Sequence, residues 1–171
     1  WVEDCEGFGD PCDLVSKRTD TFSRKKRFWC STPGTGEKCR IYSRYIQGDQ
    51  REFRVPCPHC GELHALQWDN LIWDKDEGGN HLPQTARMKC PNCGEEFSEF
   101  YKDEILKLGV WVPTNPNGLY PSYKINALYS PLGWFSWKDA VLEFLAAVKS
   151  NSRAKMRAFV NNVLGEIFIE Q

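Results

Sequence analysis

Hydrophobic residues in the last third of the chain recur with the period of amphipathic helices. Ser136, followed by Asp139 three positions later, is typical of a helix start at which the two side chains cap backbone N–H groups. Six apolar residues then fall on one helical face: Trp137, Ala140, Val141, Phe144, Leu145 and Val148. A second stripe lies between Ser152 and Gly165 and comprises Met156, Phe159, Val160, Val163 and Leu164. The pattern predicts two helices, each with one face buried in a core.

Short apolar runs separated by turn residues dominate the middle of the chain. Within residues 52–101 the apolar positions alternate with polar ones or form brief runs, which is typical of strands. The predicted strands are residues 53–55, 63–68, 71–73 and 87–89, with a turn at 76–80. Because these runs surround two Cys-x-x-Cys pairs, we expect a small β structure here.

The other segments predict both helices and strands. Asp10 followed by Pro11 favours a helix start, because the aspartate can cap and the proline fits the first turn. Helices are predicted at residues 10–18, 37–47 and 102–108, and strands at residues 27–31, 110–112 and 120–128. The strand at 27–31 is apolar enough to be buried. The fold class predicted for the whole chain is mixed α/β.

Four of the eight cysteines have the spacing of metal ligands. Cys57 and Cys60 form one Cys-x-x-Cys pair, Cys90 and Cys93 form the other, and each pair is followed by glycine. Two intervening residues let both sulfurs converge on one ion, and four thiolates complete the closed tetrahedral shell of a structural zinc site. His59 is an alternative ligand inside the first pair.

The other cysteines and histidines lack such spacing. Cys5, Cys12, Cys30 and Cys39 are predicted to be small buried hydrophobic residues. His64 and His81 are predicted to be polar surface residues. No signal peptide is recognisable and no apolar run is long enough to cross a membrane, so we expect a reducing, cytosolic setting.

Charge is distributed unevenly, although the formal net charge is only −1. Residues 17–54 contain eleven Lys or Arg and four Asp or Glu, whereas residues 51–101 contain five and nine. The densest basic cluster is Arg24, Lys25, Lys26 and Arg27. Such a cluster is either a solvated surface or a contact for phosphates, and both interpretations stay open. The acidic middle segment favours a structural staple or a protein contact over phosphate binding.

Motifs that would indicate a complete active site are missing. Residues 34–38 (Gly-Thr-Gly-Glu-Lys) differ from a phosphate loop, because Lys38 does not follow glycine and Cys39 replaces the required serine or threonine. The carboxylates show no spacing that indicates a nuclease. The chain also starts at Trp1 without methionine. We therefore expect a piece of a longer protein that is inactive as an enzyme on its own.

Several motifs together resemble one family, the large terminase subunit of tailed bacteriophages of the lambda gpA type. In chain order they are Gly9-Asp10-Pro11 with Lys17-Arg18, Ser31-Thr32-Pro33, Gly48-Asp49-Gln50, Val55 through Glu62, Ala127 through Pro131 with Trp134, Phe159 through Asn162, and Leu164-Gly165-Glu166. They are spread over nearly the whole chain, so their combination is specific even though each one alone is weak.

The resemblance implies a DNA-packaging motor in the host cytoplasm. Such proteins have an N-terminal P-loop ATPase that uses ATP and Mg²⁺ to translocate double-stranded DNA, and a C-terminal metal-dependent nuclease that cuts concatemers. Their implied partners include the small terminase subunit and the portal ring. On this basis residues 1–50 are the end of the ATPase α/β sheet, 51–101 an inserted zinc ribbon, and 102–171 a mixed strand and helix segment leading toward the nuclease.

The resemblance also implies a role for Ser31 and Thr32. They match the family's coupling motif, a pair of hydroxyls near the terminal phosphate of the nucleotide. The alternative is a Ser/Thr turn that caps the following helix. For the chain as a whole, the alternative function is a free-standing zinc-ribbon adaptor or nucleic-acid-binding module without enzymatic activity.

Overall fold

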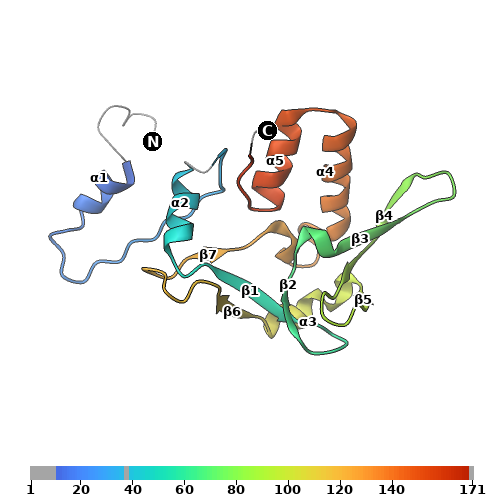
Figure 1. Ribbon diagram of the computed structural model, residues 1–171, viewed down its shortest axis with the longest axis horizontal. Helices are drawn as coiled ribbons and strands as arrows, with labels where there is room; N and C mark the ends of the chain where they lie inside the picture. Colours follow the sequence, from blue (N-terminus) through green and yellow to red (C-terminus); the bar gives the residue numbers. More distant parts are fainter. Residues whose placement is uncertain (1–10, 37–38, 170–171) are drawn as a thin grey trace. The chain divides into compact units, whose positions relative to one another are not determined.

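The computed structural model describes residues 11–36 and 39–169 (Figure 1). The chain divides into two compact units, Trp1–Ser31 and Thr32–Gln171.

The first unit contains one short helix followed by an irregular segment. Helix α1 spans Pro11–Lys17, close to the predicted 10–18, while Asp10 lies outside the described residues. Arg27 folds back on the end of this helix, where its Nη2 donates to the Ser16 carbonyl oxygen at 2.7 Å. Thr19 accepts a second bond from the same guanidinium, at 2.8 Å.

The buried strand predicted at residues 27–31 does not form. The backbone there has no regular structure, and the Phe28 side chain is 85% exposed. A strand needs a partner for its backbone N–H and C=O groups, and the described residues of this unit include no other strand. Apolar composition alone therefore did not specify a strand.

The second unit begins with helix α2, Arg40–Gln47, inside the predicted 37–47. Residues 37 and 38 lie outside the described residues. The N–H of Gly48 bonds the Tyr45 carbonyl at 3.1 Å and ends the helix. The next N–H, of Asp49, bonds the Tyr120 carbonyl at 2.9 Å, so the chain is joined directly to a segment 71 residues away.

Two small sheets follow. The first contains β1 (Arg51–Pro56), β2 (Leu63–Ala65), β6 (Val110–Pro113) and β7 (Tyr123–Lys124). Strand β1 pairs antiparallel with β2 and β6 and parallel with β7. The second sheet has the order β3 (Leu71–Lys75), β4 (His81–Lys89) and β5 (Glu96–Phe97), all antiparallel. The β3–β4 hairpin extends away from the rest of this unit (Figure 1).

One predicted strand is much shorter than expected. Of residues 120–128 only Tyr123–Lys124 pairs as a strand. Pro121 lacks the N–H that a ladder needs, and residues Ala127–Tyr129 form a 3₁₀ turn capped by the Asn126 side chain. Two further 3₁₀ turns occur at Trp68–Asn70 and Glu99–Tyr101.

The C-terminal helices agree with the predicted pattern. Helix α3 spans Lys102–Lys107, α4 spans Trp137–Lys149 and α5 spans Arg153–Ala158. Ser136 and Asp139 form the predicted capping box. In the stripe on α4, Ala147 is buried and Val148 is 51% exposed, contrary to the prediction for Val148. After α5 the helix widens into a π-turn at Phe159–Val163.

One hydrophobic core links the ribbon strands to the C-terminal helices. Helix α4 packs against β4, and α4 and α5 lie side by side as an antiparallel pair (Figure 1). The fully buried side chains of this core include Val55, Leu66, Met88, Leu128 and Trp137. The mixed α/β prediction is confirmed. The predicted division at residues 101 and 102 runs through this core.

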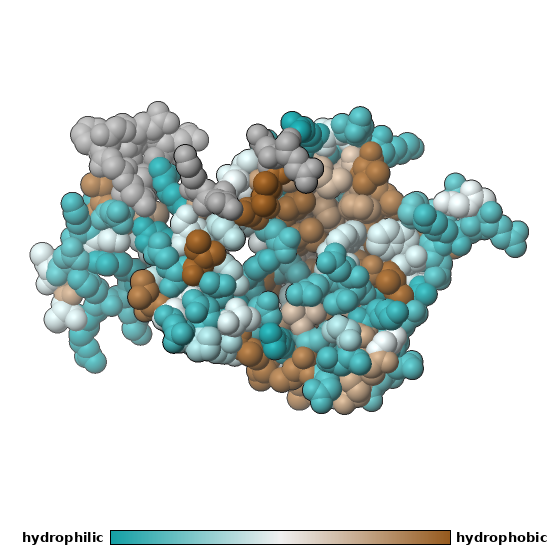
Figure 2. Space-filling view, viewed as in Figure 1, coloured by the Kyte–Doolittle hydropathy of each residue, from teal (hydrophilic) through white to brown (hydrophobic). Residues whose placement is uncertain are grey.

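Hydrophobic atoms also reach the surface in small patches among hydrophilic ones (Figure 2). One patch lies at the lower edge of the view, over α3 and β6, where Leu108 is 60% and Val110 is 44% exposed. No helix among the described residues has the length and hydropathy to span a membrane.

Candidate metal centre

The first Cys-x-x-Cys pair occupies the tip of the β1–β2 hairpin. The Cys57 N–H bonds the Glu62 carbonyl at 3.0 Å and so continues the strand pairing into the loop. The Gly61 N–H returns to the Cys57 carbonyl at 2.9 Å. Gly61 has φ +76°, a left-handed conformation that favours glycine and turns both sulfurs toward one side.

The second pair repeats this arrangement between β4 and β5. The Cys90 N–H bonds the Glu95 carbonyl at 2.8 Å, and the Gly94 N–H bonds the Cys90 carbonyl at 2.9 Å. Gly94 has φ +80°. The two loops therefore have the same backbone conformation and hydrogen bonds, as expected from their shared Cys-x-x-Cys-Gly sequence.

The four sulfur atoms converge on a single point. The Sγ atoms of Cys57 and Cys93 are 3.9 Å apart, as are those of Cys60 and Cys90. All four Sγ atoms lie within 4.8 Å of one another. A tetrahedral site with Zn–S bonds of about 2.3 Å requires sulfur separations of about 3.8 Å. Two of the sulfur pairs thus match the separation that a tetrahedral zinc ion requires, and each other pair, at 4.8 Å or less, is at most about 1 Å wider.

His59 points away from the sulfur cluster. Its Nε2 lies 3.2 Å from the carbonyl oxygen of Glu96, the first residue of β5, which directly follows the other cysteine loop. Its backbone N–H lies 3.4 Å from the Cys57 sulfur. The histidine therefore connects the two loops and supports a ligand, and it does not replace one.

Burial and proximity set the ionisation of the thiols. Burial opposes ionisation of Cys90, but hydrogen bonds from the N–H groups of Cys93 and Asn92 and from the Cys57 and Cys93 thiols together outweigh it and lower the pKa of the Cys90 thiol to about 7. At Cys93 the Glu95 N–H lowers the pKa, but burial and the three neighbouring sulfurs raise it to about 12. A divalent cation would supply the positive charge that allows all four thiols to ionise together.

The remaining cysteines do not behave as predicted. Cys30 is exposed, while Cys12 and Cys39 are half-buried. The Cys39 sulfur lies 3.1 Å from the Gly34 N–H. Cys5 lies outside the described residues. The prediction of small buried residues is therefore wrong for Cys30, which belongs to the segment where no strand forms.

The basic cluster lies on the surface of the first unit. Arg24, Lys25, Lys26 and Arg27 are all exposed. Lys25 and Arg27 pair with Asp20 at 2.8 and 2.6 Å, and these hydrogen bonds lower the pKa of the Asp20 carboxyl. Within the described part of the chain, Arg24 and Lys26 have no ion-pair partner.

Ser31 and Thr32 are exposed and do not follow a strand. The division between the two compact units falls between them.

Comparison with protein families assigns the chain. Residues 1–111 match the model of the family described as "Phage terminase large subunit gpA, ATPase domain". Residues 120–171 match "Terminase large subunit gpA, endonuclease domain". The chain belongs to the phage terminase large subunit gpA family.

Curated relatives within this family are similar over nearly the whole chain. The "Terminase, large subunit" of Enterobacteria phage P21 is 26% identical and covers 98% of this chain. That of Escherichia phage lambda is 24% identical and covers 96% of it. The chain spans 28% of the length of each relative. No solved structure matches the chain.

The segments matched to the two terminase domains share one core. Lys102 is fully buried, and its Nζ lies 2.5 Å from Glu99 Oε1 and 2.9 Å from the Ser130 carbonyl. The Trp137 N–H bonds the same Glu99 oxygen at 3.1 Å. Two residues of the ATPase-matched segment are thus hydrogen-bonded to the endonuclease-matched segment.

A second set of bonds joins the same segments. The Tyr129 hydroxyl accepts the Leu66 N–H at 2.8 Å and donates to the Phe53 carbonyl. The Asn126 side chain donates to the Leu66 carbonyl at 2.8 Å. Strand β1 and the residue after β2, which flank the first cysteine loop, are therefore hydrogen-bonded to the start of the endonuclease-matched segment.

Sequence reasoning missed two buried polar residues. His64 is only 5% exposed, and its ring packs edge-on against Phe97 at 5.9 Å between centroids. The prediction that His64 lies on the surface is wrong. The signal that could have indicated its burial is its position on β2, directly opposite Val55 on β1. For Lys102 the signal was weaker. It lies three positions before Ile105 on α3, which puts both residues on the same, buried helix face.

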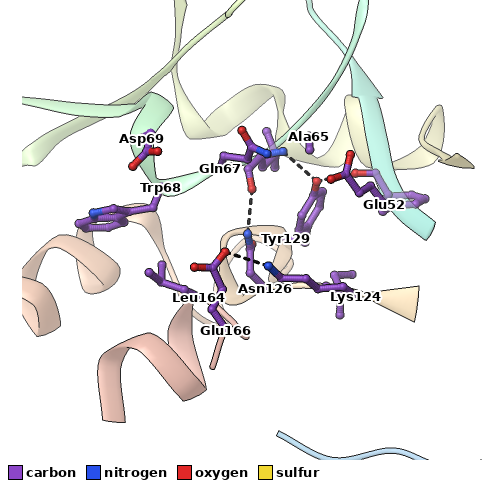
Figure 3. Close-up of a pocket in the computed structure, with 13 residues that line it drawn as sticks. Glu52, Ala65, Gln67, Trp68, Asp69, Lys124, Asn126, Tyr129, Leu164 and Glu166 are labelled. Carbon is purple, nitrogen blue, oxygen red and sulfur yellow. Dashed lines mark hydrogen bonds and ion pairs between the residues drawn. The ribbon is translucent and has the colours of Figure 1, made fainter. Parts of the chain in front are cut away.

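A cavity of about 210 Å³ also lies between these terminase segments (Figure 3). The Lys124–Glu166 ion pair, 2.8 Å long, lies at one side of it, and Trp68, Asp69 and Glu52 also line it. The lining residues among those that the structure describes include no serine, cysteine or histidine.

Proposed function

We propose that this part of the terminase large subunit holds a structural zinc ion that fixes the junction of its ATPase and endonuclease segments. The observation that carries the proposal is the cluster of four cysteine sulfurs within 4.8 Å of one another, contributed by two hairpin loops, with Cys57 and Cys90 buried in the shared core. Four thiolate ligands favour Zn²⁺ over harder cations, and a closed shell leaves no position for substrate.

Metal content tests this proposal. We expect elemental analysis of the purified chain to find about one zinc per molecule, and a strong chelator to remove the ion together with ordered structure. The ion should be absent from a variant in which Cys60 and Cys93 are both serine, whereas Cys12→Ser should retain it. A folded, metal-free sample would refute the zinc proposal.

For the intact protein we propose ATP-driven translocation of double-stranded DNA and cutting of concatemers. The names of the two matched domains and of the phage relatives support this. ATP and Mg²⁺ would be its cofactors, the small subunit and the portal ring its partners, and the host cytoplasm its location.

The isolated chain should catalyse neither reaction. The sequence has no phosphate loop, and within the described residues the cysteine cluster is the one group arranged for a metal. ATPase and nuclease assays with Mg²⁺ test this expectation. Metal-dependent turnover that survives repurification would contradict it.

We also propose that Ser31 and Thr32 couple nucleotide state to movement. Family resemblance and their position at the division between the units support this role. Replacing both with Ala in the full-length protein should preserve ATP binding and impair hydrolysis or packaging. A normal packaging rate in the double variant would show that these residues form only a local turn and have no coupling role.

The exposed basic cluster is proposed to contact DNA phosphates. We expect weak, sequence-independent binding of duplex DNA that falls steeply between about 50 and about 200 mM salt. Neutralising Arg24, Lys25, Lys26 and Arg27 should remove it. Neutralising the exposed residues Lys149, Arg153, Lys155 and Arg157, which removes the same charge, serves as the matched control. Binding that is insensitive to salt or to the first substitution would assign the cluster to a solvated surface.

A further inference from the structure

Helix α2 ends without the usual glycine cap. The last four carbonyl groups of a helix have no partner within it, and a left-handed glycine after the helix often turns the chain to supply one. Gly48 is extended instead, with φ −85° and ψ −173°. None of the eight residues of α2 is buried, and so short a helix is marginal in water without outside support. The end of α2 therefore depends on hydrogen-bond donors beyond the helix.

A distant segment, residues 114–122, supplies most of these donors, and we call it the capping segment. Three of its groups donate to carbonyls in the last turn of α2: Tyr120 Oη to Arg44 at 2.9 Å, Ser122 Oγ to Tyr45 at 2.9 Å, and the Leu119 N–H to Gln47 at 2.9 Å. The remaining carbonyl, of Ile46, accepts from Gln50 Nε2 at 2.9 Å. All four terminal carbonyls of α2 thus have a partner, three of them through the capping segment.

The same segment holds the corner that follows α2. Asn115 donates to the Gly48 carbonyl through Nδ2 and to the Asp49 carbonyl through its N–H, each at 3.0 Å. The Asp49 carboxylate in turn accepts the Ser122 N–H at 2.9 Å. Gly118 packs so closely on Gly48 that a Cβ at residue 118 would lie 2.1 Å from the Gly48 carbonyl carbon. Docking of the capping segment therefore requires glycine at position 118.

The capping segment is held mainly by hydrogen bonds and not by the hydrophobic core. Leu119 is 79% exposed, and Thr114, Pro116, Asn117 and Tyr120 are exposed as well. A hydrogen bond that replaces a bond to water contributes little net free energy. Segments with few buried apolar contacts also open more readily than a core does. The capping segment should therefore leave α2 at a lower free-energy cost than unfolding of the core.

This contact joins the two segments that match terminase domains. Helix α2 lies within residues 1–111, whereas the capping segment begins in residues 112–119, between the two matches, and ends within residues 120–171. We propose that the capping segment is a detachable cap and that α2 is a two-state element, helical while the cap is docked and unwound when it leaves. The state of α2 is thereby tied to the position of the segment that leads into the endonuclease match.

In the intact protein this cap would connect the two activities. Helix α2 follows Ser31 and Thr32 in the chain, so a nucleotide-dependent shift there changes the fit between α2 and the cap. By reciprocity, displacement of the endonuclease segment releases α2. This consequence rests on the coupling function proposed above, whereas the cap itself does not.

Hydrogen exchange of the zinc-loaded chain, followed by NMR, tests the cap. In the wild-type chain we expect the amides of residues 44–47 in α2 to be protected. Gly118→Ala should remove that protection, because its Cβ prevents docking, while the amides of α4 stay protected. Ser122→Ala removes one donor to the helix end and should speed exchange of the α2 amides about fivefold, the equilibrium equivalent of one typical hydrogen bond.

Two variants provide matched controls. Gly78→Ala adds the same methyl group in the β3–β4 hairpin, where the Cβ would lie 3.3 Å from its nearest neighbours, both of them side-chain atoms. Ser150→Ala removes a hydroxyl that donates to the Ala147 carbonyl at 2.9 Å, at the end of α4. Both should leave exchange of the α2 amides at the wild-type rate. Zinc content verifies that each variant is folded.

Three outcomes would overturn the cap. They are α2 amides that exchange freely in the wild-type chain, α2 amides that stay protected in Gly118→Ala, and loss of protection in α2 and α4 together in that variant. The second outcome would show that α2 is stable by itself. The third would show that the capping segment belongs to the cooperative core and does not detach separately.

Exchange in the full-length protein tests the consequence separately. A non-hydrolysable ATP analogue with Mg²⁺ should change exchange in α2 and at Leu119 and Ser122 together, and Gly118→Ala should abolish the change in the capping segment. A change confined to α2 would contradict transmission through the cap. Unchanged exchange in both segments would refute the coupling function proposed for Ser31 and Thr32, while the result for the isolated chain decides the cap.

Discussion

The two compact units contain similar residues and use them differently. In the first, Phe28 is 85% exposed and Cys30 is exposed. In the second, Phe97 and Cys57 are each 2% exposed. Phe97 is opposite Met88 on a neighbouring strand and packs edge-on against Trp137 at 6.0 Å between centroids. Among the described residues of its own unit, Phe28 has no such layer and is largely exposed.

The difference shows that burial here depends on partners far away in the sequence. Strand β1 pairs with β6 almost sixty residues later, and Cys57 meets Cys93 thirty-six residues later. Each such pairing costs chain entropy. The buried ion pair and the core offset that cost, and the proposed metal ion would offset it further. The predictions below remove these partners one at a time.

Loss of a metal ligand should have the largest effect. Structural zinc sites contribute apparent binding free energies of about 10–16 kcal/mol, comparable with the whole stability of a domain. We expect Cys90→Ser to abolish cooperative unfolding of residues 32–171. Cys30→Ser, in the exposed segment, should unfold with the wild-type urea midpoint. Equal urea midpoints for the two variants would contradict the claim that the cysteines of the second unit, and not those of the first, stabilise the fold.

Breaking the buried ion pair should be the next largest change. Lys102→Met leaves Glu99 without its cation in a largely buried position, and we expect a loss of about 3 kcal/mol. Lys124→Met breaks an exposed pair with Glu166 and should cost about 0.5 kcal/mol. Urea unfolding measures both. Similar losses would indicate that Lys102 is not buried in solution.

The Tyr129 hydroxyl should have a smaller effect. Tyr129→Phe leaves the Leu66 N–H and the Phe53 carbonyl without this partner in the core, at a cost of about 2 kcal/mol. Tyr120→Phe removes a bond from the more exposed Tyr120 hydroxyl to the Arg44 carbonyl and should cost less than about 1 kcal/mol. Denaturant titration of the two variants provides the comparison.

The smallest expected change is a pH dependence caused by His64. Burial lowers the pKa of His64 below its ordinary value of 6.5, so the folded state favours the neutral ring. Its contribution is fully present above that ordinary pKa and is lost as pH falls through it toward the lowered value. Wild-type protein should lose more stability than His64→Phe between about pH 7.5 and about pH 6. Identical losses would contradict this assignment.

The features predicted from sequence are those encoded locally. The capping box at Ser136 and the glycines after each cysteine pair specify backbone geometry within a few residues. Helical periodicity likewise located α4 and most of its buried face. These signals depend on bonds between near neighbours in the chain, so one sequence suffices to find them.

The features that were missed depend on distant partners. Lys102 is buried because Ser130 and Trp137, about thirty residues later, close over it and Glu99, and the local spacing of Glu99 and Lys102 does not encode those distant contacts. The predicted strand at 27–31 failed because a strand requires a neighbour. The strand at 120–128 shrank because residues 127–129 turn to place Tyr129 against Leu66. Which partner each residue finds is a property of the assembled core.

Hydrogen exchange before and after zinc removal tests the central claim most directly. The claim is that the metal centre and helices α4 and α5 form one cooperative unit through their shared core. We predict that chelation of zinc from the chain removes amide protection from both cysteine loops and from α4 together, and that added zinc restores both. Protection that persists in α4 after the loops have become unprotected would contradict the claim.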